Sequence, residues 1–356
     1  MARFARRPSP VAAIFRPVTI LKPLCGAEPG LAANLASFFA QDHLADDRPA
    51  FQIVMGLQNP DDPARAVAAE VRARYPAVPA DLVVVDERDS PRRVANPKVA
   101  NLLNMIPVAR HDLLVLADAD MRVRPEYLTA VTAPLADPGV GLVTCLYRGV
   151  ATGNLWTRLG ACHINHGFLP QALVGDALGQ GAGCFGATIA LTRPTLEAIG
   201  GLEAVADDLA DDHALGQAVI RLGGAIHLSA HLVDTLVTED RLTTLFAHEL
   251  RWARTVLLSA PAGYTASVVT HPLALALLAL ATGVPSAPYV LAVALACRLA
   301  TAWHNQQALD LPPAPLWLLP LRDLLSFAVF LSSFANRTVQ WRQATLRVDR
   351  HRLIVD

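Results

Sequence analysis

The sequence predicts an α/β fold with a mostly parallel, Rossmann-like sheet, followed by apolar helices that associate with a membrane. Apolar runs of strand length alternate with helical segments from Val18 onward, which is typical of parallel strands joined by right-handed crossovers. The run Leu113–Leu116 is continuously apolar rather than alternating, so it indicates a buried parallel strand. Of the 356 residues, 53% are hydrophobic and only 17% are charged, and the mean hydropathy of +0.34 is high for a soluble protein.

The composition also excludes some classes of protein. The formal net charge is −1 and no basic stripe stands out in the body of the chain, so nucleic acid is not expected as a partner. Five cysteines are scattered without a CxxC pair, which indicates neither a zinc site nor a disulfide framework and suits a reducing compartment.

Periodicity and breaker residues place the elements of the α/β part in order. Strands are expected over residues 18–21, 51–57, 82–85, 113–116 and 141–146, and helices over 31–39, 64–75 and 99–109. Beyond these we expect a helix over 155–172, a strand-like run over 184–191, a short helix ending at Gly200, a helix over 213–222, two short strands over 225–228 and 232–237, and a helix over 243–256.

The last third of the chain is apolar. The segment Pro272–Cys297 contains no charged residue and is long enough to span a bilayer, but the break at Gly283–Pro288 allows either one kinked span or a short hairpin. A second apolar stretch, Pro313–Phe334, carries Arg322 and Asp323, which can pair or snorkel.

Charges flanking the apolar segments predict the topology. The tail from Arg337 to Arg352 is strongly basic, so the positive-inside rule places the tail in the cytoplasm. Arg251 and Arg254 precede the first apolar segment and predict the same side for the α/β domain. An even number of crossings, two or four, satisfies this topology. The expected organisation is a basic lead-in (1–17), an α/β domain (18–260), membrane-embedded helices (261–336) and a basic tail (337–356).

Asp118 and Asp120 follow the central strand, where open α/β sheets place their ligands. Two carboxylates on one turn can hold Mg²⁺ or Mn²⁺ together with substrate phosphates, although a solvated acidic turn is an alternative. Asp61 and Asp62 follow the second strand, where an acid can accept hydrogen bonds from a nucleoside; a turn-forming Asp before Pro63 is the alternative.

Asn96-Pro97-Lys98 opens a helix, where a lysine and the helix N-terminus can neutralise phosphate, unless Lys98 is a simple surface residue. The cluster from Asp207 to Asp212 can supply a general base near a bound diphosphate, while most of these acids are expected to cap the next helix.

Arg251 and Trp252 precede the apolar segments. A cation there can stabilise a departing diphosphate, and an interfacial Arg/Trp anchor is the alternative interpretation. His163 and His166 are three residues apart on a predicted helix, but metal ligation would need a third ligand.

The order of these motifs resembles the inverting membrane glycosyltransferases of family 2 and 21 type with a GT-A fold, and more narrowly the ceramide glucosyltransferases. The motifs that match are Leu21-Lys22-Pro23-Leu24-x-Gly26, Gln58-x-x-Asp61-Asp62-Pro63, Asn96-Pro97-Lys98-x-x-Asn101-Leu102, Gly141-Leu142-Val143, Asp211-Asp212, Arg251-Trp252 and Trp341-Arg342. The stretches Leu142–Gly149, His163–Pro170, Asp211–Gly216 and His248–Thr255 are most similar to the bacterial hopanoid-biosynthesis-associated glycosyltransferases.

This resemblance implies transfer of N-acetylglucosamine from its UDP conjugate to the lipid bacteriohopanetetrol, with a divalent cation as cofactor and a bacterial inner membrane as the location. The roles it implies are: Asp62, Asn96, Lys98, Asp118, His166, Cys184 and Asp211 at the nucleotide-sugar; Asp118 and Asp120 at the metal; Asp212 as general base; and Arg251 with Trp252 in the last motif. The first position of that motif is His248 rather than Gln or Arg, and the N-terminal transmembrane helix usual in the family has no counterpart in residues 1–17.

Other functions stay open at this point. One alternative is a ceramide glucosyltransferase that uses UDP-glucose. Another is a glycosyltransferase acting on a lipid phosphate, which needs no general base. A membrane-anchored nucleotide-binding protein without catalysis is a third, and the full set of acids disfavours it.

Overall fold

The computed structural model describes residues 16–86, 94–179, 183–313 and 315–335, Met1 and Phe4, and the backbone of residues 338–341, 344–349 and 352–354. Most of the basic lead-in and the side chains of the basic tail therefore lie outside the described residues. The chain forms two compact units. We call Arg6–Tyr147 with Val174–Leu236 the sheet unit, and Met1–Ala5, Arg148–Leu173 and Val237–Asp356 the helical unit.

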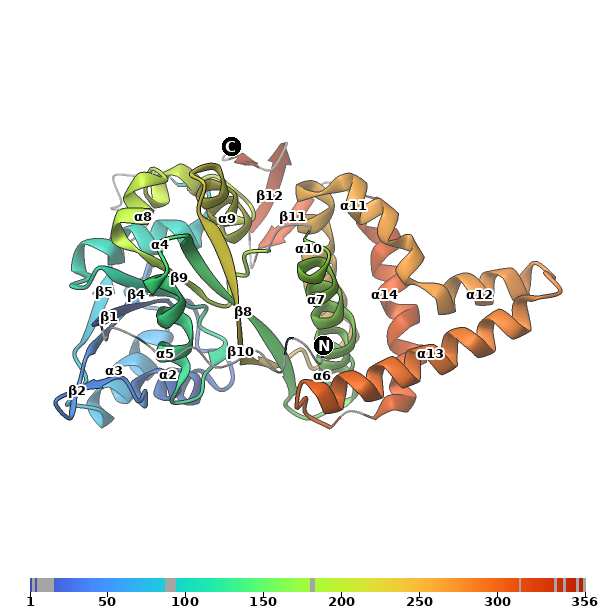
Figure 1. Ribbon diagram of the computed structural model, residues 1–356, viewed down its shortest axis with the longest axis horizontal. Helices are drawn as coiled ribbons and strands as arrows, with labels where there is room; N and C mark the ends of the chain where they lie inside the picture. Colours follow the sequence, from blue (N-terminus) through green and yellow to red (C-terminus); the bar gives the residue numbers. More distant parts are fainter. Residues whose placement is uncertain are drawn as a thin grey trace. The chain divides into compact units, whose positions relative to one another are not determined.

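Eight strands of the described chain form one mixed sheet in the order β5-β4-β1-β6-β9-β8-β10-β7 (Figure 1). Their bounds are β1 Val18–Pro23, β4 Phe51–Leu57, β5 Ala80–Val84, β6 Leu113–Leu116, β7 Met121–Arg122, β8 Val140–Ala151, β9 Ile189–Thr192 and β10 Ala225–Val237. Strands β5, β4, β1 and β6 are parallel, whereas β9 is antiparallel to both β6 and β8, and β10 to β7. The predicted α/β fold is confirmed, and the carboxyl ends of β1, β4 and β6 share one edge.

Helices cover both faces of the eight-stranded sheet. Successive residues of its buried strands point to opposite faces and are apolar, so each face needs a layer of helices to exclude water. Ile20 and Val115 pack in one core with side chains of α2 (Leu31–Phe39), α3 (Ala64–Arg74) and α5 (Tyr127–Thr132). Leu21 and Leu114 pack in the other with side chains of α4 (Pro97–Met105), α8 (Arg193–Ala198) and α9 (Asp211–Arg221). The central strands are therefore buried on both faces.

Three predicted elements of the sheet unit are corrected by the structure. Helix α9 begins at Asp211, not at His213, because two acids in its first turn complement the helix dipole. The two short strands expected over 225–237 are one strand, β10, in which Ser229 stays within the ladder and donates to the Ala130 carbonyl. The run 184–191 is a strand only from Ile189 onward.

The helical unit contains the elements expected over 155–172 and 243–256, with one interruption. A π-helical turn, Ile164–Phe168, separates α6 (Leu155–His163) from α7 (Leu169–Ala177), so the single predicted helix is wrong. The Asn165 side chain bonds both the N–H and the C=O of Gly149 at 2.8 Å, which holds this wider turn in place. Later elements are α10 Leu242–Ser259, α11 Pro261–Ala266, α12 Pro272–Ala281, α13 Ala287–Ala308, α14 Leu319–Ser333, β11 Thr338–Trp341, β12 Ala344–Asp349 and β13 Arg352–Ile354.

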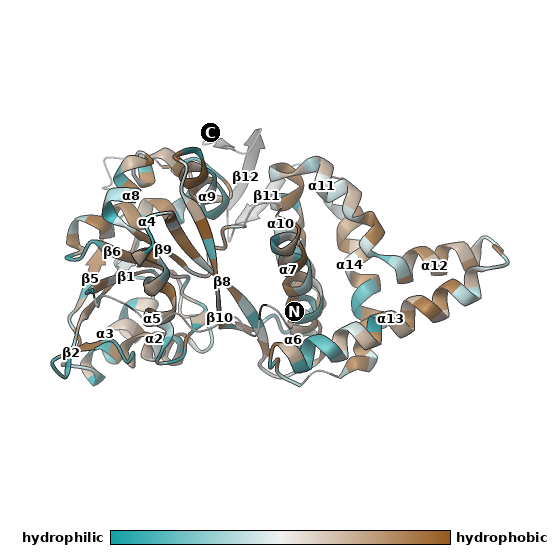
Figure 2. Cartoon of the chain, in the orientation of Figure 1, coloured by the Kyte–Doolittle hydropathy of each residue, from teal (hydrophilic) through white to brown (hydrophobic). Residues whose placement is uncertain are grey.

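The apolar segment Pro272–Cys297 is divided between α12 and α13, so the hairpin alternative holds and the single kinked span does not (Figure 2). Within the described residues, Leu316–Ser333 is one helix long and apolar enough to cross a membrane. Pro261–Thr270 and Pro272–Ala281, bent by 64° relative to each other, would count as a second if they formed one span.

Candidate active site

The carboxyl edge of the parallel strands in the sheet unit carries a compact group of charged side chains. Asp118 and Asp120 follow β6, and the ammonium group of Lys22, from the end of β1, donates to the Asp118 carbonyl oxygen. Lys22 is fully buried, with its Nζ 3.8 Å from the centre of the Phe38 ring. Burial lowers the pKa of Lys22 to about 7, although the carboxylates of Asp120 and Asp118 oppose that shift.

Lys98, in the first turn of α4, connects two acids of this group. Its Nζ lies 2.7 Å from Asp118 Oδ1 and 3.5 Å from Asp211 Oδ2. Burial alone would lower the pKa of Lys98, but the carboxylates of Asp118 and Asp211 outweigh burial and raise it above its ordinary value. Lys98 is therefore a permanent cation at this edge, not the surface lysine of the alternative interpretation.

Asn96 joins the start of α4 to the acidic cluster. Its Oδ1 accepts from the N–H groups of Lys98 (3.0 Å) and Val99 (3.3 Å), so Asn96 is the N-cap of α4. Its Nδ2 donates to the Asp208 carbonyl (3.0 Å) and to Asp211 Oδ1 (3.5 Å). One amide thus fixes the approach of Lys98 to Asp211.

Asp212 lies beside Gly186, in the segment that leads into β9. The Gly186 N–H donates to Asp212 Oδ2 at 2.8 Å, and the His213 N–H donates to Oδ1 at 2.7 Å. Loss of solvent and then the neighbouring Asp211 carboxylate raise the pKa of Asp212 from 3.8 to about 6. A carboxylate with such a pKa is suited to general-base chemistry near neutral pH.

Gly186 marks the point where three charged groups of the site converge. A Cβ added at this position would lie 3.1 Å from Lys98 Nζ and 3.3 Å from both Asp118 Oδ2 and Asp212 Oδ2. The absence of a side chain therefore leaves room next to a cation, a metal-binding candidate and a base candidate.

The donor set fits a divalent cation. Thr235 Oγ1 donates to Asp120 Oδ2 at 3.0 Å, and desolvation together with the nearby Asp118 charge raises the pKa of Asp120. Two crowded carboxylates gain most from a cation that relieves their repulsion. Among the described residues, no group of three or more His, Cys, Asp or Glu side chains could hold a metal, so Asp118 and Asp120 would share it with substrate phosphates.

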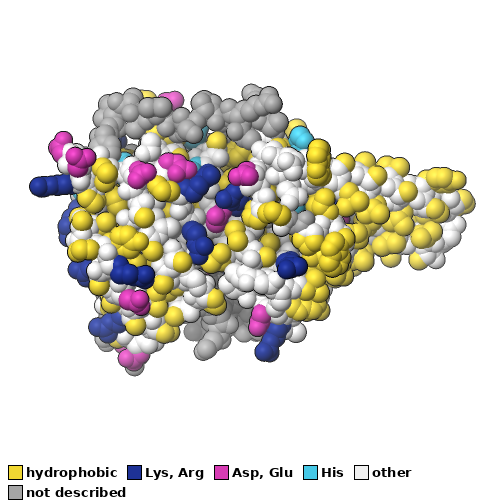
Figure 3. All heavy atoms as spheres, turned by 90° about the horizontal axis from the view of Figure 1, so that it is seen from below, with side chains coloured by type: hydrophobic (Ala, Val, Ile, Leu, Met, Phe, Trp, Pro, Cys, Tyr) yellow, Lys and Arg dark blue, Asp and Glu magenta, His cyan; other side chains and the backbone are white. Residues whose placement is uncertain are grey.

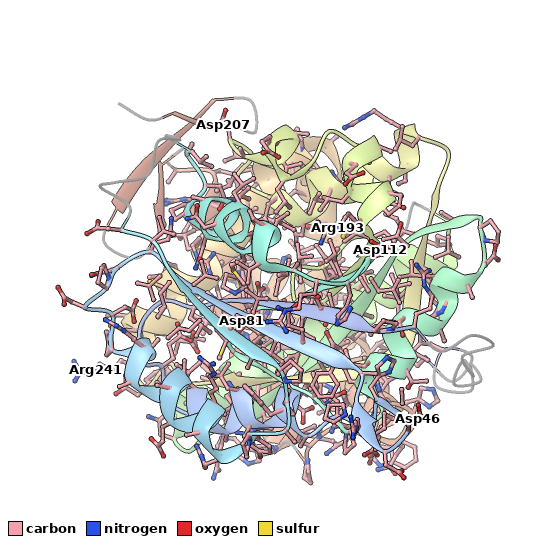
Figure 4. The ribbon with its side chains drawn as sticks, turned by 90° about the vertical axis from the view of Figure 1, so that its left-hand side faces the viewer. Asp46, Asp81, Asp112, Arg193, Asp207 and Arg241 are labelled. Carbon is pink, nitrogen blue, oxygen red and sulfur yellow. The ribbon has the colours of Figure 1, made fainter. Side chains whose placement is uncertain are left out.

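Asp62 and Cys184 also belong to the sheet unit. Asp62 accepts from the Gly26 N–H at 2.9 and 3.0 Å and from the Ala64 N–H at 2.8 Å, so its carboxylate holds the loops after β1 and β4 together. Cys184 is buried against Gly216, and desolvation raises the pKa of its thiol well above the usual value, which favours the neutral thiol. The carboxylate of Asp207, labelled in Figure 4, accepts a hydrogen bond from the Ala95 N–H at 3.4 Å.

The remaining predicted site residues belong to the helical unit. Trp252 on α10 stands one turn after His248, with their rings 4.3 Å apart, and His248 Nδ1 makes a hydrogen bond with Glu239. His166 lies buried in the π-helical turn, where Arg298 donates to its carbonyl at 2.6 Å. Neither of its ring nitrogens has a hydrogen-bond partner among the described residues. Arg251 lies between His248 and Trp252 on α10.

Sequence reasoning missed three residues of the acidic edge: Lys22, Gly186 and Thr235. Lys22 was part of a matching motif, but its burial under Asp118 depends on strand pairing. Thr235 reaches Asp120 only because β10 pairs with β7, where Thr235 faces Met121. Gly186 lacks any local signal in the sequence, since its importance comes from three side chains on other elements.

Comparisons with known proteins agree with this architecture. The family model described as "Glycosyl transferase family 21" matches residues 1–354. A ceramide glucosyltransferase of Komagataella phaffii is 31% identical over 124 residues, covering 35% of this chain and 23% of that protein. Ceramide glucosyltransferase 1 of Caenorhabditis elegans is 24% identical over 220 residues, covering 60% of this chain and 44% of that protein. The chain thus matches less than half the length of these curated relatives.

A solved structure shares the fold. The mannosyltransferase of Pyrobaculum calidifontis, in complex with GDP-Man and Mn²⁺, superimposes with a TM-score of 0.56 at 19% identity, over 93% of this chain and 92% of that one. At this identity the likeness concerns the fold alone.

Proposed function

This chain belongs to glycosyl transferase family 21, and from that premise we propose that it transfers a sugar from a UDP-sugar to a hydroxyl group of a membrane lipid. The expected pair is UDP-N-acetylglucosamine and bacteriohopanetetrol, from the stretches that resemble hopanoid-associated enzymes. The observation that carries the proposal is the convergence of Lys98, Asp118 and Asp212 around Gly186. The names of the curated relatives support a lipid acceptor.

Asp212 is assigned as the general base. Its carboxylate, oriented by the Gly186 and His213 N–H groups, takes the proton from the acceptor hydroxyl as that oxygen attacks C1 of the sugar. In-line attack opposite the departing diphosphate inverts the configuration at C1. Asn96 and Lys98 hold Asp211 beside it, so the base stays in a fixed position.

The departing diphosphate needs positive charge. Lys98 supplies a permanent cation at the acidic edge, and Mg²⁺ or Mn²⁺ held by Asp118 and Asp120 would neutralise phosphate charge when bound. The Mn²⁺ in the mannosyltransferase structure supports this cofactor. Arg251 is assigned to the same leaving group, and Asp62 to the nucleoside.

In the helical unit, Glu239 fixes the ring of His248 through Nδ1 and leaves Nε2 as its second hydrogen-bonding atom. His248 occupies the motif position where the related glycosyltransferases carry Gln or Arg. We assign His248 a contact with the diphosphate, supported by Trp252. His166 and Cys184 are proposed as residues close to the donor, the role that the family resemblance implies.

A detergent-based UDP-release assay tests the proposal. UDP-glucose and UDP-N-acetylglucosamine are each paired with bacteriohopanetetrol, with ceramide and with a lipid phosphate, with and without Mg²⁺. Release only with N-acetylglucosamine and the hopanoid supports the narrow assignment, whereas release with glucose and ceramide moves the enzyme to the sphingolipid alternative. Turnover that is unchanged by a chelator contradicts a metal at Asp118 and Asp120, and turnover with lipid phosphates alone contradicts a hydroxyl acceptor.

The pH dependence of kcat/KM reports on the base. Asp212 must be deprotonated to accept a proton, and its pKa is raised to about 6, so the active fraction falls as the pH drops through that value. We expect kcat/KM to be flat above about pH 7 and to fall about tenfold per pH unit below about pH 5. A profile that is flat down to pH 4.5 contradicts the assignment.

Substitution Gly186→Ala tests the geometry of the site. The new Cβ would press on Lys98, Asp118 and Asp212 at 3.1–3.3 Å, so the ends of these side chains must move by a few tenths of an ångström. We expect turnover to fall roughly 10- to 100-fold with an unchanged melting temperature, because small displacements of reacting groups are costly. The control is Gly175→Ala, where an added Cβ meets nothing within 4 Å. Equal activity of both variants contradicts the proposed site.

The proposed location is a bacterial cytoplasmic membrane with the sheet unit in the cytoplasm. The apolar helices α12 and α14 and the basic tail support it.

A further inference from the structure

The helices α12 and α13 form a hairpin that exposes apolar side chains in the part of the chain that the structure describes. Exposed apolar side chains lie on both arms and at the tip: Leu275, Leu278, Leu280, Val284, Tyr289, Val290 and Val293. Leu278 is 54% exposed and Val293 is 62% exposed. The α12–α13 segment, at the right of Figure 3, shows many hydrophobic side chains on its surface. A contiguous apolar surface of this kind is a binding surface.

Charged and polar groups mark the base of both arms. The first arm begins after His271, whose ring packs against Phe327 and Phe330 of α14 at 5.5 and 5.2 Å. The apolar part of the second arm ends at Cys297, because the next residue, Arg298, pairs with Asp323 of α14 at 2.8 Å. Between His271 and Arg298 the chain has no charged residue. The hairpin therefore has an apolar body above a polar base, and α14 holds both arms at that base.

The arms are too short to cross a bilayer. At 1.5 Å per residue, the 10 residues of α12 span about 15 Å, and the part of α13 from Ala287 to Cys297 spans about 16 Å. The hydrocarbon core of a bilayer is about 30 Å thick, so each arm reaches about its middle.

The turn at the tip pairs several of its polar groups within the hairpin, which lowers the cost of placing it in hydrocarbon. The N–H groups of Gly283 and Val284 donate to the carbonyls of Leu280 and Ala279 at 3.1 and 3.0 Å. Thr282 Oγ1 donates to the Leu278 and Ala279 carbonyls at 3.2 and 3.0 Å. Gly283 adopts φ +75°, which glycine alone adopts without strain, and so closes the turn.

We propose that the α12–α13 hairpin is a re-entrant anchor that enters one leaflet of a lipid bilayer and returns on the same side. Its occupant is the acyl-chain layer of that leaflet, and the Arg298–Asp323 pair lies at the headgroup level. This inference rests on the proposed membrane association but not on the identity of sugar or acceptor.

Cysteine labelling in sealed vesicles of phosphatidylethanolamine and phosphatidylglycerol tests it. In a background of Cys25→Ser and Cys297→Ser, we compare the tip variant Ser286→Cys with Thr270→Cys at the base and Glu70→Cys on α3. A membrane-impermeant maleimide should label Glu70→Cys and Thr270→Cys from one side. It should label Ser286→Cys from neither side until detergent is added.

Two results would overturn the proposal. Labelling of Ser286→Cys from the side opposite to Glu70→Cys would show a spanning hairpin. Labelling from the same side would show that the tip lies outside the hydrocarbon. Failure of the protein to float with the vesicles would instead refute the membrane association itself.

A second measurement avoids dependence on the tip variant. One nitroxide label is placed on the native Cys297 in the Cys25→Ser variant, and another on Val293→Cys in the double-serine background. The depth of each label in the bilayer follows from its relative exposure to oxygen and to a water-soluble nickel complex. Val293→Cys should lie about 6 Å deeper than Cys297, since one helical turn separates them. Equal depth at both positions would contradict entry along the arm.

Discussion

Asp212→Asn is expected to reduce turnover by about 10²- to 10⁴-fold, because the amide cannot accept the proton of the acceptor hydroxyl. In the parent protein the Gly186 N–H donates to Asp212 Oδ2 at 2.8 Å. The amide oxygen of the variant can accept the same hydrogen bond, so the fold and the donor site should persist. Turnover is measured by UDP release, and UDP binding by calorimetry. UDP affinity should change little, since the base acts on the acceptor.

The matched control is Asp207→Asn, in the same acidic cluster. The carboxylate of Asp207 accepts from the Ala95 N–H, and an amide oxygen can do the same, so turnover should stay within about threefold of the parent. The residual activity of Asp212→Asn should also lose its dependence on pH near 6. If Asp212→Asn keeps most of its turnover while binding UDP, another base acts or the acceptor is a phosphate.

Arg322→Leu is expected to lower the free energy of unfolding in detergent by about 3–5 kcal/mol, the largest effect on stability that we anticipate. The Arg322 guanidinium on α14 makes two hydrogen bonds of 2.7 Å to the Glu249 carboxylate on α10, and Arg322 is fully buried. Removing the arginine leaves Glu249 as an uncompensated buried charge. Unfolding is followed by circular dichroism.

Two further variants separate charge burial from loss of packing. In Glu249→Leu/Arg322→Met no buried charge remains at this contact between α10 and α14, so most of the stability should return. Arg74→Leu removes an exposed ion pair of 3.8 Å with Glu70 on α3 and should cost less than about 1 kcal/mol. A double variant as unstable as Arg322→Leu would show that packing, not charge, makes this pair important.

Local sequence patterns determined most of the α/β core. In a continuously apolar strand such as Leu113–Leu116, all side chains leave water only when both faces of the sheet are covered. The structure confirms this strand, β6, and pairs it with the parallel strand β1. The position of Asp118 at the end of β6 followed from the same run. The sequence Asn96-Pro97-Lys98 likewise predicts the start of a helix, because the N-cap hydrogen bonds of Asn96 involve only residues two and three positions later.

Contacts between distant segments decided the rest. The π-helical turn at Ile164–Phe168 depends on the Asn165 side chain bonding Gly149, and no periodicity signals that contact. The pairing of Thr235 with Asp120 depends on β10 meeting β7. The sequence by itself determined which residues carry charge and which stretches form the strands and helices of the α/β core, because these depend mainly on neighbours along the chain. Only the tertiary structure decided that Gly186, Lys98, Asp118 and Asp212 converge, because that proximity arises from the packing of four separate segments.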